Sequence, residues 1–89
     1  MASQFQKSVK AAVESAEAKV VADAVTCKND GTVLVRRSYF YTHGQTAERW
    51  ANKVSADLTA AGIAHTAIGR DDYANWPKTS YFTAIISPA

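Results

Sequence analysis

Residues 22–41 read ADAVTCKNDGTVLVRRSYFY, and this stretch decides how the first half of the chain folds. Two runs rich in β-branched and aromatic residues flank Asn29, Asp30 and Gly31. Glycine readily adopts the positive φ that a three-residue hairpin loop needs, so we expect Gly31 to close such a loop. The stretch therefore predicts two antiparallel strands joined by a tight turn.

The loop also predicts the register of the two strands, because Lys28 and Thr32 flank it. The expected cross-strand pairs are Cys27 with Val33, Val25 with Val35, and Asp23 with Arg37, the last as an ion pair. Side chains alternate between the two faces of a strand. We expect the face that holds these pairs, with Tyr39 and Tyr41, to point to the core. The opposite face is expected to carry Ala24, Leu34, Arg36, Ser38 and Phe40.

The composition fits one small domain over residues 1–89. The chain has 89 residues, of which 47% are hydrophobic, and this is near the lower size at which packing alone stabilises a fold. A single cysteine excludes an internal disulfide, so nothing indicates a secreted, disulfide-bonded scaffold. The sequence has no long apolar run, and its first residues mix charged and apolar types, unlike a signal peptide. We expect a soluble cytoplasmic protein with no membrane partner.

Helix signals lie on both sides of the hairpin. Ser3 and Gln6 match the capping-box spacing and an apolar stripe follows, which predicts a helix that ends near Lys19. A second helix is predicted after Thr46, with Gly62 as its C-terminal stop.

Two further strands complete the expected fold. Residues 63–69 predict a weaker strand and residues 80–86 a stronger one, with a polar and aromatic loop over 71–78 between them. The element order α-β-β-α-β-β argues for an α+β fold with a four-stranded, mainly antiparallel sheet. A right-handed crossover through the second helix leaves a gap that the last strand fills, which gives strand order 1-2-4-3. Both helices then cover one face of the sheet, and the other face stays open.

An aromatic residue beside an arginine on the open face indicates a contact surface. Bases of single-stranded nucleic acid can stack on Phe40 while Arg36 meets phosphate. A protein partner can use the same two residues, because aromatic residues and arginine are enriched at interface hot spots. The alternative is that the faces are assigned wrongly and Phe40 belongs to the core.

The predicted loop over residues 71–78 is the second candidate surface. It is long for a hairpin connection and carries Tyr73, Trp76 and Lys78, while Pro77 restrains its exit into the last strand. Loops of this kind often bind partners. In the alternative, Trp76 folds back over the end of the sheet and shields the core.

The charge pattern is only mildly polarised. The formal net charge of +2 is too small to imply a nucleic-acid partner by itself. The positive excess lies in the middle of the chain. Arg49 and Lys53, one turn apart on the second helix, are the phosphate contacts we expect if nucleic acid binds.

Signals for catalysis or metal binding are weak. His43 and His65 have no clustered carboxylate, and two such histidines are more often a loop residue and a strand residue. Cys27 is predicted on the buried face, where a thiolate is not accessible. Asp71 and Asp72 lack the spacing of a calcium loop. We predict a protein that is not an enzyme and has no catalytic residue, metal or cofactor.

The sequence thus predicts a non-enzymatic protein that occupies a surface on a macromolecular partner, more often a protein than a nucleic acid because the net charge is low. The expected contact residues are Arg36, Phe40, Tyr73, Trp76 and Lys78. In size and organisation the chain resembles small accessory proteins of mobile elements, including phage-encoded inhibitors of host defence, which implies a stand-alone binder. Two alternatives stay open: a single-stranded nucleic-acid or RNA-binding module, and a self-associating protein that uses a strand edge, with a homodimer as the default form.

Overall fold

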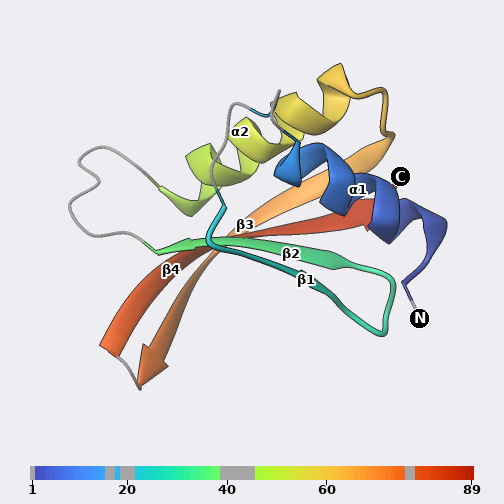
Figure 1. The fold of residues 1–89 in the computed structure, drawn as a ribbon. Coiled ribbons are helices and arrows are strands. Elements are labelled where there is room, and N and C mark those ends of the chain that lie inside the picture. Colours follow the sequence, from blue (N-terminus) through green and yellow to red (C-terminus); the bar gives the residue numbers. More distant parts are fainter. Residues whose placement is uncertain (1, 16–17, 19–21, 39–45, 76–77) are drawn as a thin grey trace.

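The computed structural model of the chain confirms the α+β fold and the predicted strand order. It describes residues 2–15, 18, 22–38, 46–75 and 78–89, and for residues 73–75, 78 and 79 it describes the backbone. The sheet is antiparallel, in the order β1-β2-β4-β3, and both helices lie on one side of it (Figure 1). The elements are α1 (Gln4–Glu14), β1 (Ala24–Cys27), β2 (Val33–Ser38), α2 (Ala47–Ala60), β3 (His65–Asn75) and β4 (Lys78–Pro88).

The β1–β2 hairpin has the predicted register. Val25 pairs with Val35, Cys27 pairs with Val33, and Gly31 has a φ of 92°. The turn is closed by the Lys28 amide, which donates to the Thr32 carbonyl at 2.9 Å. Turn chemistry therefore fixes which side chains of the central strand β2 reach the core.

The predicted ion pair between Asp23 and Arg37 is wrong. The Asp23 carboxylate instead accepts hydrogen bonds from the Ser38 hydroxyl and the Ser38 backbone N–H, both at 2.7 Å. These two hydrogen bonds lower the pKa of Asp23, and the charge of Arg37 contributes less. Arg37 is exposed, and its guanidinium carbon lies 6.0 Å from the centre of the Trp50 ring. Two donors of Ser38 close to the Asp23 carboxylate thus prevail over a longer-range ion pair with the flexible Arg37 side chain.

Helix α1 begins as predicted and ends earlier. Ser3 and Gln6 form the capping box, which confirms the N-terminus. The helix stops at Glu14, because Ser15 is already extended with φ −65° and ψ 148°. Serine competes for backbone hydrogen bonds and weakens a helix end, so the predicted end near Lys19 is wrong. Residues 16–17 and 19–21 lie outside the described residues.

Gln6 does more than cap α1. Its side chain is buried, and its amide donates to the Lys28 carbonyl at 2.6 Å and to the Thr32 carbonyl at 2.9 Å. Its Oε1 accepts from the Ser3 N–H at 2.9 Å. One side chain therefore ties the first turn of α1 to the two residues that flank the hairpin turn.

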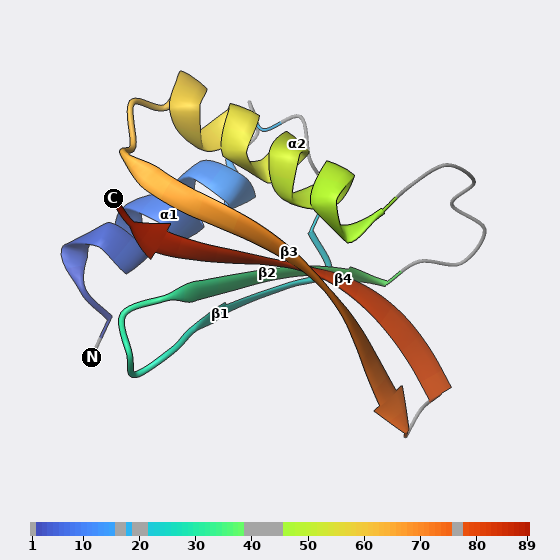
Figure 2. The same cartoon turned by 180° about the vertical axis from the view of Figure 1, so that it is seen from behind.

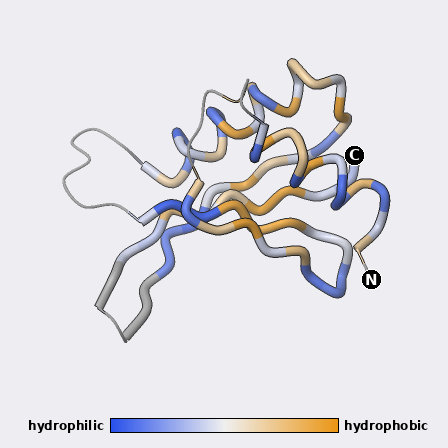
Figure 3. The backbone as a smooth tube through the Cα atoms, in the orientation of Figure 1, coloured by the Kyte–Doolittle hydropathy of each residue, from blue (hydrophilic) through white to orange (hydrophobic). Residues whose placement is uncertain are grey.

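The core lies between the sheet and the two helices. Trp50 is 1% exposed, and its indole N–H donates to the Val35 carbonyl of β2 at 2.9 Å. Figure 3 shows apolar stretches along the strands beneath the helices, while the β1–β2 turn is hydrophilic. The buried apolar residues of this core are Val9, Val13, Val33, Val35, Ala47, Trp50, Ala51, Val54, Leu58, Phe82, Ala84 and Ile86. Val33 and Val35 confirm the predicted core face of β2.

Helix α2 approaches β3 closely at Gly69. A Cβ atom at this position would clash with the Ala47 carbonyl oxygen. Only glycine admits this approach without a backbone shift.

The C-terminal end of α2 follows the prediction, since Gly62 has a φ of 76° just after the helix. No helix of the described residues is long and apolar enough to cross a membrane.

The predicted loop over residues 71–78 is wrong, because most of it is strand. β3 continues to Asn75 and β4 begins at Lys78, with Asp72 opposite Tyr81 and Asn75 opposite Lys78. β2 ends at Ser38, opposite Tyr81, so the last part of the β3–β4 hairpin extends beyond β2 as a two-stranded arm (Figures 1 and 2). Two consecutive aspartates look like a turn in the sequence, but here the Asp72 carboxylate has partners on the sheet itself.

Candidate functional site

The face of the sheet opposite the helices has no described element packed on it (Figures 1 and 2). We call it the open face. The strand registers bring its side chains into cross-strand rows, and three of these rows cross three or four strands. The rows are Thr26, Leu34, Ile85 and Ile68; Ala24, Arg36, Thr83 and Arg70; and Ser38, Tyr81 and Asp72.

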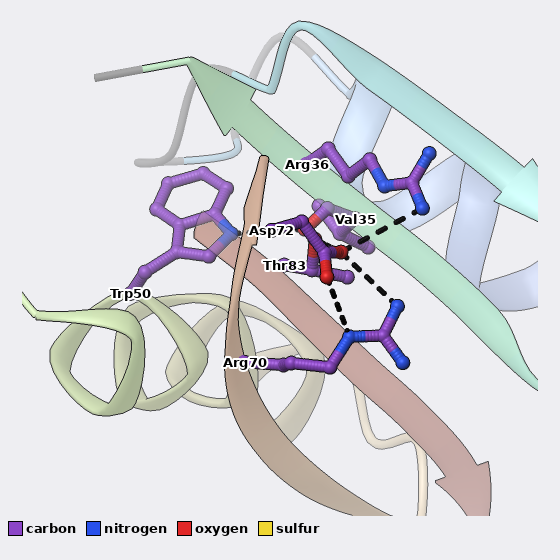
Figure 4. A network of polar contacts seen from close by, with 6 residues as sticks. All are labelled: Val35, Arg36, Trp50, Arg70, Asp72 and Thr83. Atoms are coloured by element: carbon purple, nitrogen blue, oxygen red, sulfur yellow. Dashed lines mark hydrogen bonds and ion pairs between the residues drawn. The ribbon is translucent and has the colours of Figure 1, made fainter. Parts of the chain in front are cut away.

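A polar network occupies the middle of the open face (Figure 4). The Asp72 carboxylate makes a two-pronged contact with Arg70, with Nε to Oδ1 at 2.8 Å and Nη2 to Oδ2 at 3.0 Å. The Thr83 hydroxyl donates to Oδ2 at 2.5 Å. Arg36 approaches from β2, with Nη2 3.7 Å from Oδ2. Three strands thus contribute to one network around a single carboxylate.

The network keeps Asp72 ionised. The hydrogen bond from Arg70 is the largest cause that lowers the pKa of Asp72, and the Thr83 hydroxyl and the charges of Arg70 and Arg36 act in the same direction. Partial burial opposes them. The same contact raises the pKa of Arg70. At neutral pH, two guanidinium groups face one carboxylate, and one positive charge remains uncompensated in the network.

Arg36 is held less tightly than Arg70. Its side chain is 35% exposed, and its distance to Asp72 exceeds hydrogen-bond length. Its Nε is buried and has no hydrogen-bond partner. A buried donor without an acceptor is costly, so this guanidinium has unused capacity to donate.

An apolar row runs beside the network. Leu34 is buried, Ile85 is half-buried, and Ile68 on β3 is 64% exposed. Among the residues whose side chains are described, Ile68 is the large hydrophobic residue that is exposed. An exposed isoleucine that continues a row of apolar side chains on a rigid sheet offers a partner a contact that needs no reordering.

The structure places the predicted contact residues unevenly. Arg36 lies on the open face as expected. Tyr73 pairs with Ser80 and Lys78 pairs with Asn75, so both belong to the two-stranded arm and not to a loop. Phe40 and Trp76 lie outside the described residues, and the prediction that they contact a partner stays untested.

Arg49 and Lys53 do not join this surface. Both are exposed on α2, which covers the other face of the sheet. The Thr46 side chain accepts from the Arg49 N–H at 3.1 Å and so caps the N-terminus of α2. One ligand on the open face therefore cannot use the arginine pair of the sheet and these two side chains as a continuous track.

The histidine and cysteine hypotheses gain no support from the geometry. His65 Nε2 lies 2.6 Å from the Ser55 hydroxyl, and Nδ1 lies 2.7 Å from the Ile63 carbonyl. These contacts tie α2 to the start of β3. Within the described part of the chain, no three His, Cys, Asp or Glu side chains group together as metal ligands. His43 lies outside the described residues, and Cys27 is half-buried with a free thiol.

Sequence reasoning missed four residues that build the polar network and the exposed end of the apolar row: Ile68, Arg70, Asp72 and Thr83. A signal was present, since Ile68, Arg70 and Asp72 alternate with a period of two, as strand residues do. The prediction assigned Asp71 and Asp72 to a loop and ended the strand at residue 69, so the alternation was not followed further.

Comparisons with protein-family models, with curated proteins and with solved structures found no significant match. Fold and surface together define the class: a small α+β domain whose antiparallel sheet carries helices on one face and a charged and apolar surface on the other.

Proposed function

We propose that this protein is a non-enzymatic binder that occupies a surface on a protein partner through its open face. One observation carries the proposal: an exposed isoleucine, Ile68, lies beside a preorganised arginine and aspartate network on an otherwise uncovered sheet. Interfaces combine an apolar centre with a polar rim that contains arginine, and this surface offers both elements side by side.

The magnitude of the apolar contribution is moderate. Full burial of an isoleucine side chain is worth about 1.5 to 3 kcal/mol. Ile68 is 64% exposed, so a partner that covers it gains about 1 to 2 kcal/mol from this residue. The remaining affinity has to come from the arginines and from contacts across the rest of the sheet.

A protein partner fits the open face better than nucleic acid does. Asp72 cancels one of the two guanidinium charges and leaves a single excess positive charge, whereas binding along a phosphate backbone relies on several uncompensated cations. Tyr81 is the aromatic residue of the open face whose side chain is described, and single-strand binding relies on several stacked rings. Arg49 and Lys53 lie on the helix side of the molecule.

Affinity copurification from cells that express the protein tests the proposal. The wild type is compared with Ile68→Asp, which places a carboxylate where the partner is expected to bury an isoleucine. Ala56→Asp is the matched control, because it adds the same charge at an exposed position on α2. We expect a protein that resists nuclease, is retained by the control variant and is lost with Ile68→Asp.

Other outcomes refute the proposal. Recovery of nucleic acid that nuclease removes, with steep salt dependence, supports the single-stranded nucleic-acid hypothesis instead. Equal recovery by both variants moves the binding surface away from the open face. An accessory or inhibitory role in a mobile element is an expectation from size and organisation, and the identity of the recovered partner decides it.

A further inference from the structure

β3 is an edge strand with an unusually long free side. It has eleven residues and, within the described chain, pairs with β4 alone. Figure 2 shows its outer side with no other described strand beyond it. An unpaired strand edge presents backbone donors and acceptors that another strand can use.

The hydrogen-bond alternation shows which residues of β3 direct their backbone outward. Lys28 donates to the Thr32 carbonyl, so the even-numbered residues of β2 bond toward β1. Hydrogen-bonded and non-bonded pairs alternate in antiparallel sheets, and the registers are continuous from β2 through β4 to β3. Ala67, Gly69 and Asp71 therefore point their N–H and C=O groups away from β4.

Between these residues, Ile68 and Arg70 present their side chains on the open face. A strand added to this edge would place alternate side chains directly beside them. Ile68 is 64% exposed and the Arg70 side chain is 50% exposed, so both are available to a neighbouring strand. The network with Arg36 and Asp72 carries one excess positive charge.

We infer that the partner contributes an extended segment that adds to β3 as a fifth strand, with an apolar side chain beside Ile68 and a carboxylate beside Arg70. This inference rests on the proposed function and names the kind of partner that the open face takes. Backbone hydrogen bonds along the edge supply affinity, and the two side-chain positions supply specificity. The open face of a second copy brings the same network of Arg36, Arg70 and Asp72 with its excess positive charge, so charge complementarity favours an acidic segment of another protein.

Two synthetic peptides test the inference against the full-length protein. Each peptide has about seven residues and blocked ends. Threonine occupies every second position, and the positions between hold valine except for one, which holds a charged residue. The charged residue is glutamate in one peptide and lysine in the other. We expect saturable NMR shifts and slower hydrogen exchange at the Ala67, Gly69 and Asp71 amides, with the glutamate peptide binding about tenfold more tightly, ~1.4 kcal/mol.

Substitutions at one edge residue separate strand addition from simple surface contact. Asp71→Pro removes an outward N–H, whereas Asp71→Ala keeps it and changes the same side chain. We expect the glutamate peptide to bind the alanine variant and not the proline variant, with amide spectra showing that both remain folded. Arg70→Glu should reverse the preference between the two peptides.

Several results overturn the inference. They are equal binding of both peptides, an absence of shifts at the three amides, or a dimer whose β3 amides are protected without peptide. If copurification depends on Ile68 but the β3 amides show neither shifts nor slower exchange, strand addition is refuted and the proposed function still holds. Copurification that is independent of Ile68 would refute the proposed function itself.

Discussion

Gln6→Ala should destabilise the fold far more than the loss of a polar side chain in the first turn of a helix usually does. The substitution removes the two bonds from the Gln6 amide to the Lys28 and Thr32 carbonyls and the bond from Ser3 to Gln6 Oε1. The Gly31 N–H still donates to the Lys28 carbonyl, and the Lys28 N–H still donates to the Thr32 carbonyl. Each lost bond therefore costs its net value and not a full desolvation penalty.

The expected loss of unfolding free energy is about 2 to 3 kcal/mol, taking ~1 kcal/mol for each bond and less for the local bond from Ser3. For a domain of this size, that lowers Tm by roughly 10 to 20 °C. Gln4→Ala is the matched control, since Gln4 is exposed on the same helix and its amide reaches only the Ser8 hydroxyl at 3.3 Å. Urea unfolding followed by far-ultraviolet circular dichroism measures both. If the two variants unfold within ~0.5 kcal/mol of each other, Gln6 does not hold the hairpin to α1.

Three further predictions concern the sheet. Asp72→Asn should be less stable than wild type at neutral pH, because the folded state lowers the pKa of Asp72. That difference is present above the unfolded pKa of about 3.9 and is lost as the pH falls through the lower folded value, so urea midpoints should converge in acid. Gly69→Ala should cost about 1 to 3 kcal/mol or more, because its Cβ meets the Ala47 carbonyl; Thr66→Ala, exposed on the same strand, should unfold near the wild-type midpoint. Arg37→Ala should lower the free energy of unfolding by about 1 kcal/mol or less, because Ser38 satisfies Asp23 and the contact with the Trp50 ring is what is lost. A clearly larger loss would restore the ion pair that the sequence suggested.

Local rules predicted the parts of the fold in which few residues decide the outcome. Gly31 fixed the hairpin loop, and with it the alternation that buries Val33 and Val35. The caps at Ser3 and Thr46 located both helix starts. Strand order followed from the handedness of the crossover through α2. In each case the relevant contacts lie close together in sequence or obey a strong topological rule.

Predictions failed where a distant partner decides the structure. Asp72 belongs to a strand because Arg70, Thr83 and Arg36 surround its carboxylate, and two of these come from other strands. Gln6 reaches a turn more than twenty residues away in the chain, which no helix pattern reveals. The exposure of Ile68 depends on β3 being an edge strand on the open face. The candidate site was therefore only partly predictable: Arg36 lies on the open face as expected, and its contact with a partner stays a prediction.

Whether the open face binds the partner is tested most simply by comparing Ile68→Asp with Ala56→Asp. The amount of partner protein recovered is measured in nuclease-treated copurifications of both variants. We expect the Ile68 variant to recover at least about tenfold less partner than the control, which corresponds to ~1.4 kcal/mol. Both variants should remain folded by circular dichroism. Equal recovery from the two folded variants would contradict the claim that the open face binds the partner.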